Sequence, residues 1–392
     1  MWPVDPLKSL FWVILVAALA PIVARVLPGR LPAVVFMIIG GVVIGPEVLA
    51  NASPDDMSLL STLGLSFLFL LAGYELEPTL MRQPPGKIAI RSWFVSAALS
   101  LAVTALLYQA GIINDFVEIA IALTTTALGT LLPILRDAGV MDGPLGPYVF
   151  AAGAVGEFFP IVAMALLLTS SGPIGGLFAL FGMAAATLIA LLIIRWVKRK
   201  GWGEKLRLPE DATGQTTLRW TLVLLAGLVL AADDFGLDVV LGAFLAGVVL
   251  RQWAPVSAES LERKLEAVGY GVFIPIFFVT SGMKLDIISI LENPLRLLLF
   301  FVLLFAVRGL PQLFMYRGQL DRVQRWQMVF LTATALPLLV ALADVGTESG
   351  LMLPENAAAL VGAGALSVLV FPLVATTLKS KSTATSVESA TG

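Results

Sequence analysis

Two ionisable residues, Glu157 and Arg308, lie inside long apolar stretches of the sequence. Glu157 stands in Ala-Gly-Ala-Val-Gly-Glu-Phe-Phe-Pro, and Arg308 stands in Phe-Ala-Val-Arg-Gly-Leu-Pro. A charge near the centre of a bilayer costs several kcal/mol, so such residues usually serve a function. Their opposite charges predict a pair. The alternatives are that both only hold helices together, or that Arg308 reaches the membrane surface.

A single buried carboxylate can hold a proton or a small monovalent cation, but not both at once. Burial favours the protonated form of a carboxyl group and a nearby Arg favours the charged form, so Glu157 could titrate without help from histidine. Gly153 and Gly156 lie one turn and one residue earlier, where they allow backbone to approach closely. Simple helix packing through small residues is the alternative for these glycines.

The amino-acid composition requires a lipid environment. Hydrophobic residues make up 58% of the 392 residues and charged residues only 13%, whereas soluble proteins carry about 25% charged residues. Apolar runs bounded by charges or by Gly and Pro predict about thirteen spans, so we expect an all-α polytopic membrane protein. The predicted spans are residues 9–27, 32–49, 58–76, 88–110, 115–135, 147–169, 174–196, 217–233, 237–252, 269–285, 294–316, 325–344 and 356–378.

The positions of the 25 Lys and Arg residues predict the orientation of the chain. If the N-terminus lies outside, nearly all of them fall in segments on the inner side, where basic residues concentrate. Lys8, Lys284 and Arg296 then lie outside, and Arg308 lies within a span. We therefore expect a multi-pass protein of the cell membrane with its N-terminus outside and its C-terminus in the cytoplasm.

The run Leu-Thr-Thr-Thr-Ala-Leu at 123–128 is nearly repeated as Leu-Thr-Ala-Thr-Ala-Leu at 331–336. The same spacing brings the first span onto the start of the span at 217–233. Because equivalent spans are an odd number apart, the repeats are inverted, as in many secondary transporters. The expected parts of one transmembrane domain are repeat one, 1–170; a linker span, 171–215; repeat two, 216–379; and a disordered tail, 380–392. A chance match in a chain rich in Ala, Leu and Thr is the alternative.

Both repeated runs lie in spans that contain residues able to break a helix. These residues are Thr124, Thr125, Thr126, Gly129 and Pro133 in the first span, and Thr332, Thr334 and Pro337 in the second. Pro removes a backbone donor, and Thr hydroxyls can satisfy backbone groups that a break leaves open. Two broken helices that cross near the midplane would present oxygen atoms to an ion. The predicted ion and proton site is Glu157, Thr124, Thr125, Thr126 and Gly153, with Arg308 as charge partner.

Four further residues are accessory candidates. Thr332 and Thr334 belong to the second broken span. Glu75 ends the span at 58–76 on the inner side, and Asp344 ends the span at 325–344 on the outer side. Glu75 could serve a cytoplasmic funnel, and the alternative is an ordinary acid at the interface. Asp344 could lie at the outer mouth, and Lys284 is expected to anchor the outer interface.

The sequence lacks the residues that several other functions require. Cys and His are both absent, which removes disulfides, thiolate metal sites and the commonest metal ligand. There is no Walker-type loop and no nucleophile–base constellation, so neither ATP drive nor an enzyme is expected. A net charge of −2 argues against nucleic acid as a partner. We expect no cofactor, and no metal other than a monovalent cation held transiently by Glu157.

Four stretches resemble the monovalent cation:proton antiporter-2 family of the cation:proton antiporter superfamily, which has the NhaA/NapA-like antiporter fold. They are Gly-Gly-Val-Val-Ile-Gly-Pro-Glu-Val-Leu (40–49), Gly-Leu-Ser-Phe-Leu-Phe-Leu-Leu-Ala-Gly-Tyr-Glu-Leu-Glu (64–77), Gly-Ala-Phe-Leu-Ala-Gly (242–247) and Pro-Ile-Phe-Phe-Val-Thr-Ser-Gly (275–282). The resemblance implies a scaffold domain that forms a homodimer and a core domain that moves like an elevator. It also implies that Glu157 carries the ion and that Arg308 is its partner.

The chain departs from this family in one respect. Many members have Asn-Asp or Asp-Asp where this chain has Gly156-Glu157. A lone carboxylate suggests one-for-one, electroneutral exchange. No soluble nucleotide-binding regulatory domain is expected after the tail, unlike in some potassium-efflux relatives.

The function that these features favour is exchange of Na⁺ or K⁺ for H⁺ across the membrane by alternating access. Two other functions stay open at this point. A K⁺ channel-like conduit would need a filter of repeated carbonyl rings, and a Na⁺-coupled organic-anion symporter would need polar groups around a substrate-sized cavity. The expected partners are Na⁺ or K⁺, H⁺, membrane lipid and a second copy of the chain.

Overall fold

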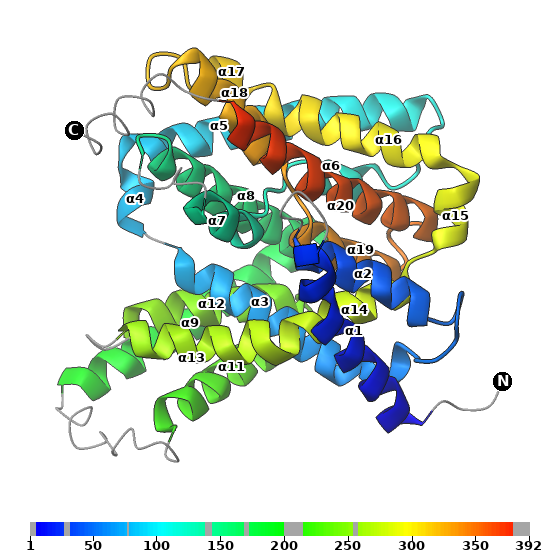
Figure 1. Cartoon of the computed structure of the whole chain (residues 1–392). Coiled ribbons are helices and arrows are strands. Elements are labelled where there is room, and N and C mark those ends of the chain that lie inside the picture. The colour runs from blue at the N-terminus through cyan, green and yellow to red at the C-terminus, as the bar shows by residue number, and fades with distance from the viewer. Residues whose placement is uncertain are drawn as a thin grey trace, which may run out of the picture. The chain divides into compact units, whose positions relative to one another are not determined.

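The regular structure in the described part of the chain is entirely helical (Figure 1). In this computed structural model that part comprises residues 5–26, 32–76, 78–137, 143–167, 172–199, 215–253 and 258–378. The predicted tail at 380–392 and residues 200–214 of the predicted linker lie outside the described residues. The expected all-α fold class is confirmed.

Ten helical segments within the described residues are long and apolar enough to cross a membrane. Two shorter apolar helices, α2 (Ala33–Ile44) and α12 (Val239–Trp253), lie on two more of the predicted spans. The predicted span at 115–135 holds the half-helices α6 (Phe116–Ala122) and α7 (Leu128–Asp137). Every predicted span therefore carries helix, while the number of crossings and the inverted repeat stay predictions.

Packing divides the chain into two compact units. Unit 1 comprises residues 1–17, 51–76 and 161–280, and unit 2 comprises residues 18–50, 77–160 and 281–392. The helices wholly in unit 1 are α3 (Ser58–Glu75), α9 (Gly172–Arg199), α11 (Thr216–Asp234), α12 and α13 (Ala258–Val268). Those wholly in unit 2 are α2, α4 (Pro78–Arg82), α5 (Pro84–Gln109), α6, α7, α15 (Ile287–Glu292), α16 (Pro294–Leu303), α17 (Gln312–Met315), α18 (Arg322–Ala333), α19 (Pro337–Glu348) and α20 (Pro354–Thr377). Three helices contribute residues to both units: α1 (Pro6–Val26), α8 (Gly146–Leu167) and α14 (Ile274–Lys284).

Unit 1 is built on a close contact between α3 and α12. A Cβ atom added to Gly73 would lie 2.0 Å from the carbonyl oxygen of Phe244, and one added to Gly247 would lie 2.1 Å from that of Leu70. Because each glycine faces backbone of the other helix, the two helices touch main chain to main chain. Small residues commonly allow this approach in membranes.

One segment of unit 1 differs from the sequence-based expectation. Residues 258–268, expected between two spans, form α13 and continue through a π-helical turn, Gly269–Phe273, into α14. Leu261 and Leu265 are buried, whereas all three residues between them are charged. A search for continuous apolar runs misses such an amphipathic helix.

Unit 2 has its own apolar core, to which half-helices of both broken spans contribute. The core residues include Trp93, Leu131, Leu135, Val149, Ala152, Val155, Tyr316, Met328 and Leu331. Helix α20 packs along α16, α18 and α19, and Figure 1 shows α16 and α20 side by side.

The predicted breaks in two helices are confirmed. The first break separates α6 from α7 at residues 123–127, and the second separates α18 from α19 at residues 334–336. Pro337 begins α19, a position where its missing N–H leaves no bond unmade. Pro133 lies inside α7, so the threonine run and not this proline marks the first break.

We predict that Gly73→Ala destabilises the protein, because its methyl group would force α3 and α12 apart. Overpacking of this kind costs about 1–3 kcal/mol, which corresponds to a Tm lower by about 5 °C. Tryptophan fluorescence during heating in detergent measures the shift. Gly227→Ala in α11 is the control, because no atom lies within 4 Å of its added Cβ. Equal Tm values for the two variants would contradict the proposed contact.

Candidate functional site

The two helix breaks are bonded to each other and to α8. The backbone N–H of Ala127 donates to the carbonyl of Thr334 at 2.8 Å, and the hydroxyl of Thr126 donates to the carbonyl of Thr332 at 2.7 Å. The N–H of Thr126 donates to the carbonyl of Gly156 at 3.1 Å. Backbone groups that have left their own helices thus find partners across the crossing, as a lipid environment requires.

Threonine hydroxyls satisfy carbonyl groups at the ends of the half-helices. Thr124 donates to Ile121 and Thr125 donates to Ala122, both at 2.7 Å. Thr332 and Thr334 likewise donate to carbonyls one turn earlier in α18. Each hydroxyl oxygen keeps its lone pairs after donating its hydrogen, so the break gathers oxygen atoms that can accept a donor or ligate a cation.

Glu157 reaches this crossing from α8. Its side chain is only 7% exposed, and its Oε1 accepts from the backbone N–H of Leu128 at 2.8 Å and, more weakly, of Gly129 at 3.4 Å. These are the first two residues of α7, so the carboxylate lies at the positive end of a half-helix. The helix end replaces part of the water that the carboxylate loses on burial.

Two glycines of α8 let the breaks approach. A Cβ atom on Gly156 would lie 2.6 Å from both Cβ and Oγ1 of Thr126 and 2.7 Å from Nη2 of Arg308. One on Gly153 would lie 2.7 Å from the Leu128 side chain. Side-chain atoms therefore approach both glycines closely, and Gly156 leaves no room for a side chain of its own unless its neighbours move.

Arg308 reaches the same break through Thr126. Its side chain is 1% exposed and donates from Nε to Thr126 Oγ1 at 2.9 Å and from Nη2 to the carbonyl of Ala152 at 3.0 Å. The guanidinium therefore holds the break of α6–α7 and the backbone of α8 together. Its contact with Gly156 places the positive charge beside the residue that precedes Glu157.

Two polar residues that position Arg308 were missed in the sequence. Arg308 stands in a π-helical turn, Leu304–Gly309. Gln312 donates to the carbonyl of Arg308 at 2.8 Å and accepts from the Ser92 hydroxyl at 2.6 Å, and both side chains are buried. The signal was present, since Gln312 is an amide inside the apolar run at 294–316.

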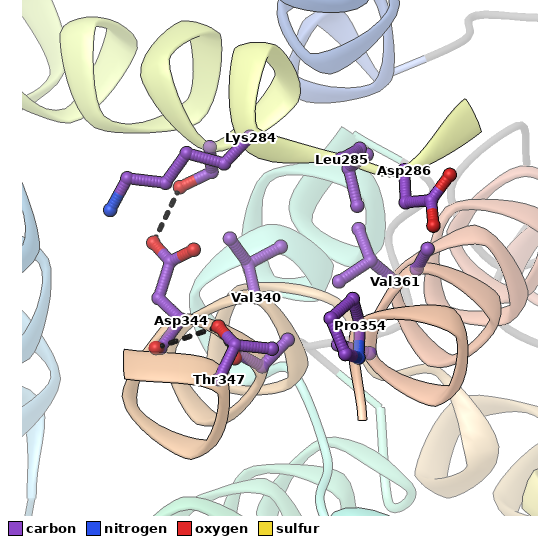
Figure 2. Close-up of a pocket in the computed structure, with 12 residues that line it drawn as sticks. Lys284, Leu285, Asp286, Val340, Asp344, Thr347, Pro354 and Val361 are labelled. Atoms are coloured by element: carbon purple, nitrogen blue, oxygen red, sulfur yellow. Dashed lines mark hydrogen bonds between the residues drawn. The ribbon is translucent and has the colours of Figure 1, made fainter. Parts of the chain in front are cut away.

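Asp344 lies further along α19 and lines a cavity of about 160 Å³ (Figure 2). Ser281 donates to its Oδ2 at 3.0 Å. Asp344 is seven residues beyond Pro337, about 10 Å along the helix from the break. Lys284, which also lines the cavity, forms an ion pair with the exposed acid Glu348 at 2.9 Å, and its place at the outer interface stays a prediction.

The remaining candidate acid and two unpredicted ones lie elsewhere. Glu75 is the last residue of α3, half-buried, in unit 1, and its role stays a prediction. In unit 2 the structure adds two buried acids, Asp115 and Glu118, which the sequence placed at the edge of a span.

Residues 14–380 match the model of the sodium/hydrogen exchanger family, a transmembrane family. The chain belongs to the sodium/hydrogen exchanger family. A Bacillus subtilis relative is 26% identical over 93% of this chain. The Na(+)/H(+) antiporter NhaS4 of Synechocystis is 29% identical over 67% of this chain and 69% of its own length. The glutathione-regulated potassium-efflux system protein KefC of Salmonella heidelberg is 26% identical over 94% of this chain.

The chain spans only part of two of these relatives. The chain spans 62% of the Bacillus subtilis relative and 59% of KefC. Among solved structures, the sodium proton antiporter MjNhaP1 from Methanocaldococcus jannaschii superposes with a TM-score of 0.64 over 95% of this chain and 96% of its own, at 16% identity. The expected antiporter fold is confirmed by this match.

We predict that Thr126→Val weakens the crossing without changing its shape. The variant removes the acceptor of Arg308 Nε and the donor to Thr332, and an unsatisfied buried donor costs about 1–3 kcal/mol. The Tm should fall by several degrees. Thr187→Val, in α9, is the matched control, because the structure gives its hydroxyl only a bond to the carbonyl of Met183 one turn earlier. A Thr126→Val protein as stable as the control would contradict the assigned role.

Proposed function

We propose that this protein exchanges a monovalent cation, Na⁺ or K⁺, for protons across the membrane. The observation that carries the proposal is the buried carboxylate of Glu157 at the crossing of two broken helices. The family membership supports it, as do the Na⁺/H⁺ and potassium-efflux names of its relatives. Those names include both cations, so the flux experiment described below is needed to decide between Na⁺ and K⁺.

Glu157 is the shared carrier in this proposal. In its charged form it attracts a small cation, and the hydroxyl oxygens of Thr124, Thr125 and Thr126 supply the kind of hard oxygen ligand that such cations prefer. In its protonated form it binds no cation. Because one carboxylate takes one charge from either occupant, the exchange is one-for-one and electroneutral.

Arg308 acts as a fixed positive charge in the same proposal. It lies beside Gly156 and opposes the negative charge of Glu157 when the site holds neither cation nor proton. Since its hydrogen bonds run to Thr126 and Ala152, it also keeps the break in place. We assign it the role of charge partner and not of ligand.

Alternating access moves the site as one body in this account. Glu157, Arg308 and both breaks belong to unit 2, so their geometry can persist while that unit moves. We further propose that the protein is a homodimer of the cell membrane, with its N-terminus outside and its C-terminus in the cytoplasm. It acts without enzymatic activity, cofactor or nucleic acid.

We predict that Glu157→Gln abolishes exchange in reconstituted vesicles, because glutamine can hold neither an exchangeable proton nor the charge that attracts a cation. A lumenal pH dye, with Na⁺, K⁺ or Li⁺ added outside, follows the flux and shows which ion is exchanged. Glu292→Gln, an exposed acid at the end of α15, should exchange like the wild type. Unchanged flux in Glu157→Gln would overturn the carrier assignment. Proton-independent cation flux in the wild type would point to a channel.

A further inference from the structure

The cavity beside Asp344 has no role in the exchange proposed for Glu157. It is bounded by the last turn of α14 and by one face each of α19 and α20, because its lining residues recur at positions i, i+3, i+4 and i+7 on both of those helices. All of them belong to unit 2. Its volume of about 160 Å³ gives room for an ion together with several waters. Since α19 begins at the second break, Asp344 lies about 10 Å along that helix from the crossing.

Oxygen-bearing side chains from two helices line this cavity (Figure 2). The Ser281 hydroxyl, on α14, lies 3.0 Å from Oδ2 of Asp344, to which it donates. The Thr347 hydroxyl, one turn beyond Asp344 on α19, donates to the carbonyls of Ala343 and Asp344 at 2.7 and 3.0 Å. Both hydroxyl oxygens keep lone pairs after donating their hydrogens. The cavity therefore offers carboxylate and hydroxyl oxygens together, which are the hard ligands that alkali cations prefer.

Asp344 keeps one carboxylate oxygen available for a ligand. Within the described residues its carboxylate accepts one hydrogen bond, from Ser281 to Oδ2, and Oδ1 accepts none. Lys284 and Glu348 both act on Asp344 through their charges, which have opposite signs. Because these two residues form an ion pair at 2.9 Å, their charges largely cancel at the cavity. The negative charge of Asp344 is left to attract a cation.

The other acids at this end of unit 2 are bound elsewhere or lie outside the cavity. Asp286 lines the cavity, but its carboxylate accepts from the backbone N–H and the hydroxyl of Ser289. Glu355, which follows the lining residue Pro354, forms an ion pair with Arg296 at 3.4 Å. The remaining acids of the surrounding elements do not line the cavity; they are Glu47, Asp115, Glu118 and Glu292.

We propose that this cavity is a second cation site, in which Asp344, Ser281 and Thr347 hold a partly hydrated monovalent cation on its way to or from Glu157. Because water supplies part of the ligand shell, this site binds the cation more weakly and less selectively than Glu157 does. A divalent ion is disfavoured, since no group of three or more acids in the described part of the chain forms a metal centre. The predicted orientation puts the cavity on the outer side. The transit role rests on the proposed cation:proton exchange, whereas binding in the cavity does not.

Crystals soaked in Tl⁺ test binding directly, because Tl⁺ is a monovalent cation that gives a strong anomalous signal. The wild type and Glu157→Gln should both show an anomalous peak in the cavity, since binding there does not need Glu157. Asp344→Asn should show none, although its amide oxygen can still accept the Ser281 hydrogen bond. Asp286→Asn is the matched control in the same cavity and should keep the peak, because Asn caps a helix as well as Asp does.

Transport in vesicles tests the transit role, with the cation added on the outer side of the protein. Asp344→Asn should raise the half-saturating cation concentration about fivefold, because the charge that attracts the cation is gone. The maximal rate should stay within about twofold of the wild type, since Glu157 is intact. Asp286→Asn should change neither quantity.

Several results would overturn this second site. A wild-type cavity without a Tl⁺ peak, or a peak that persists in Asp344→Asn, would exclude binding by Asp344. A peak that disappears in this variant while the half-saturating concentration stays unchanged would indicate an adventitious ion only. A fall in the maximal rate alone would assign Asp344 a structural role. Failure of the basic exchange function is read separately, from Glu157→Gln retaining proton-coupled flux.

Discussion

The structure of unit 2 depends on one constraint, which is that backbone groups in lipid must find partners inside the protein. The breaks at 123–127 and 334–336 free such groups from their helices. These backbone groups bind to the other break and to α8: the N–H of Ala127 donates to the carbonyl of Thr334, and the N–H of Thr126 donates to the carbonyl of Gly156. The consequence is a site where helix ends and oxygen atoms converge. Glu157 binds there to the N–H of Leu128, and Arg308 binds to the hydroxyl of Thr126.

The Gly156-Glu157 pair gains a physical explanation from this arrangement. A side chain at Gly156 would overlap Thr126 and the guanidinium of Arg308, so the missing side chain is what allows the break, α8 and Arg308 to meet. The longer carboxylate of Glu157 then reaches the start of α7. With one acid instead of two, the site has a single negative charge, which one cation or one proton neutralises. This is the basis of the proposed one-for-one exchange.

Much of this site could be predicted from the sequence, because rare charges and helix-breaking residues in apolar runs are local signals. Glu157, the threonine run at 124–126 and both breaks follow from such signals. Burial that depends on residues far away in the sequence leaves no local signal, so it could not be predicted. Asp115 stands at the edge of a predicted span, yet it is buried and accepts a hydrogen bond from Asn356, which lies 241 residues later. The π-helical turn at Arg308 likewise has no periodic signature in the sequence.

The central claim is that one carboxyl group, that of Glu157, holds either a proton or a cation. Proton release from the purified protein in detergent tests it most directly, with a pH dye in a weakly buffered solution to which Na⁺ or K⁺ is added. The account predicts about one proton released for each cation bound to the wild type, and no release from Glu157→Gln. Cation binding without proton release, or equal release from the variant, would contradict it.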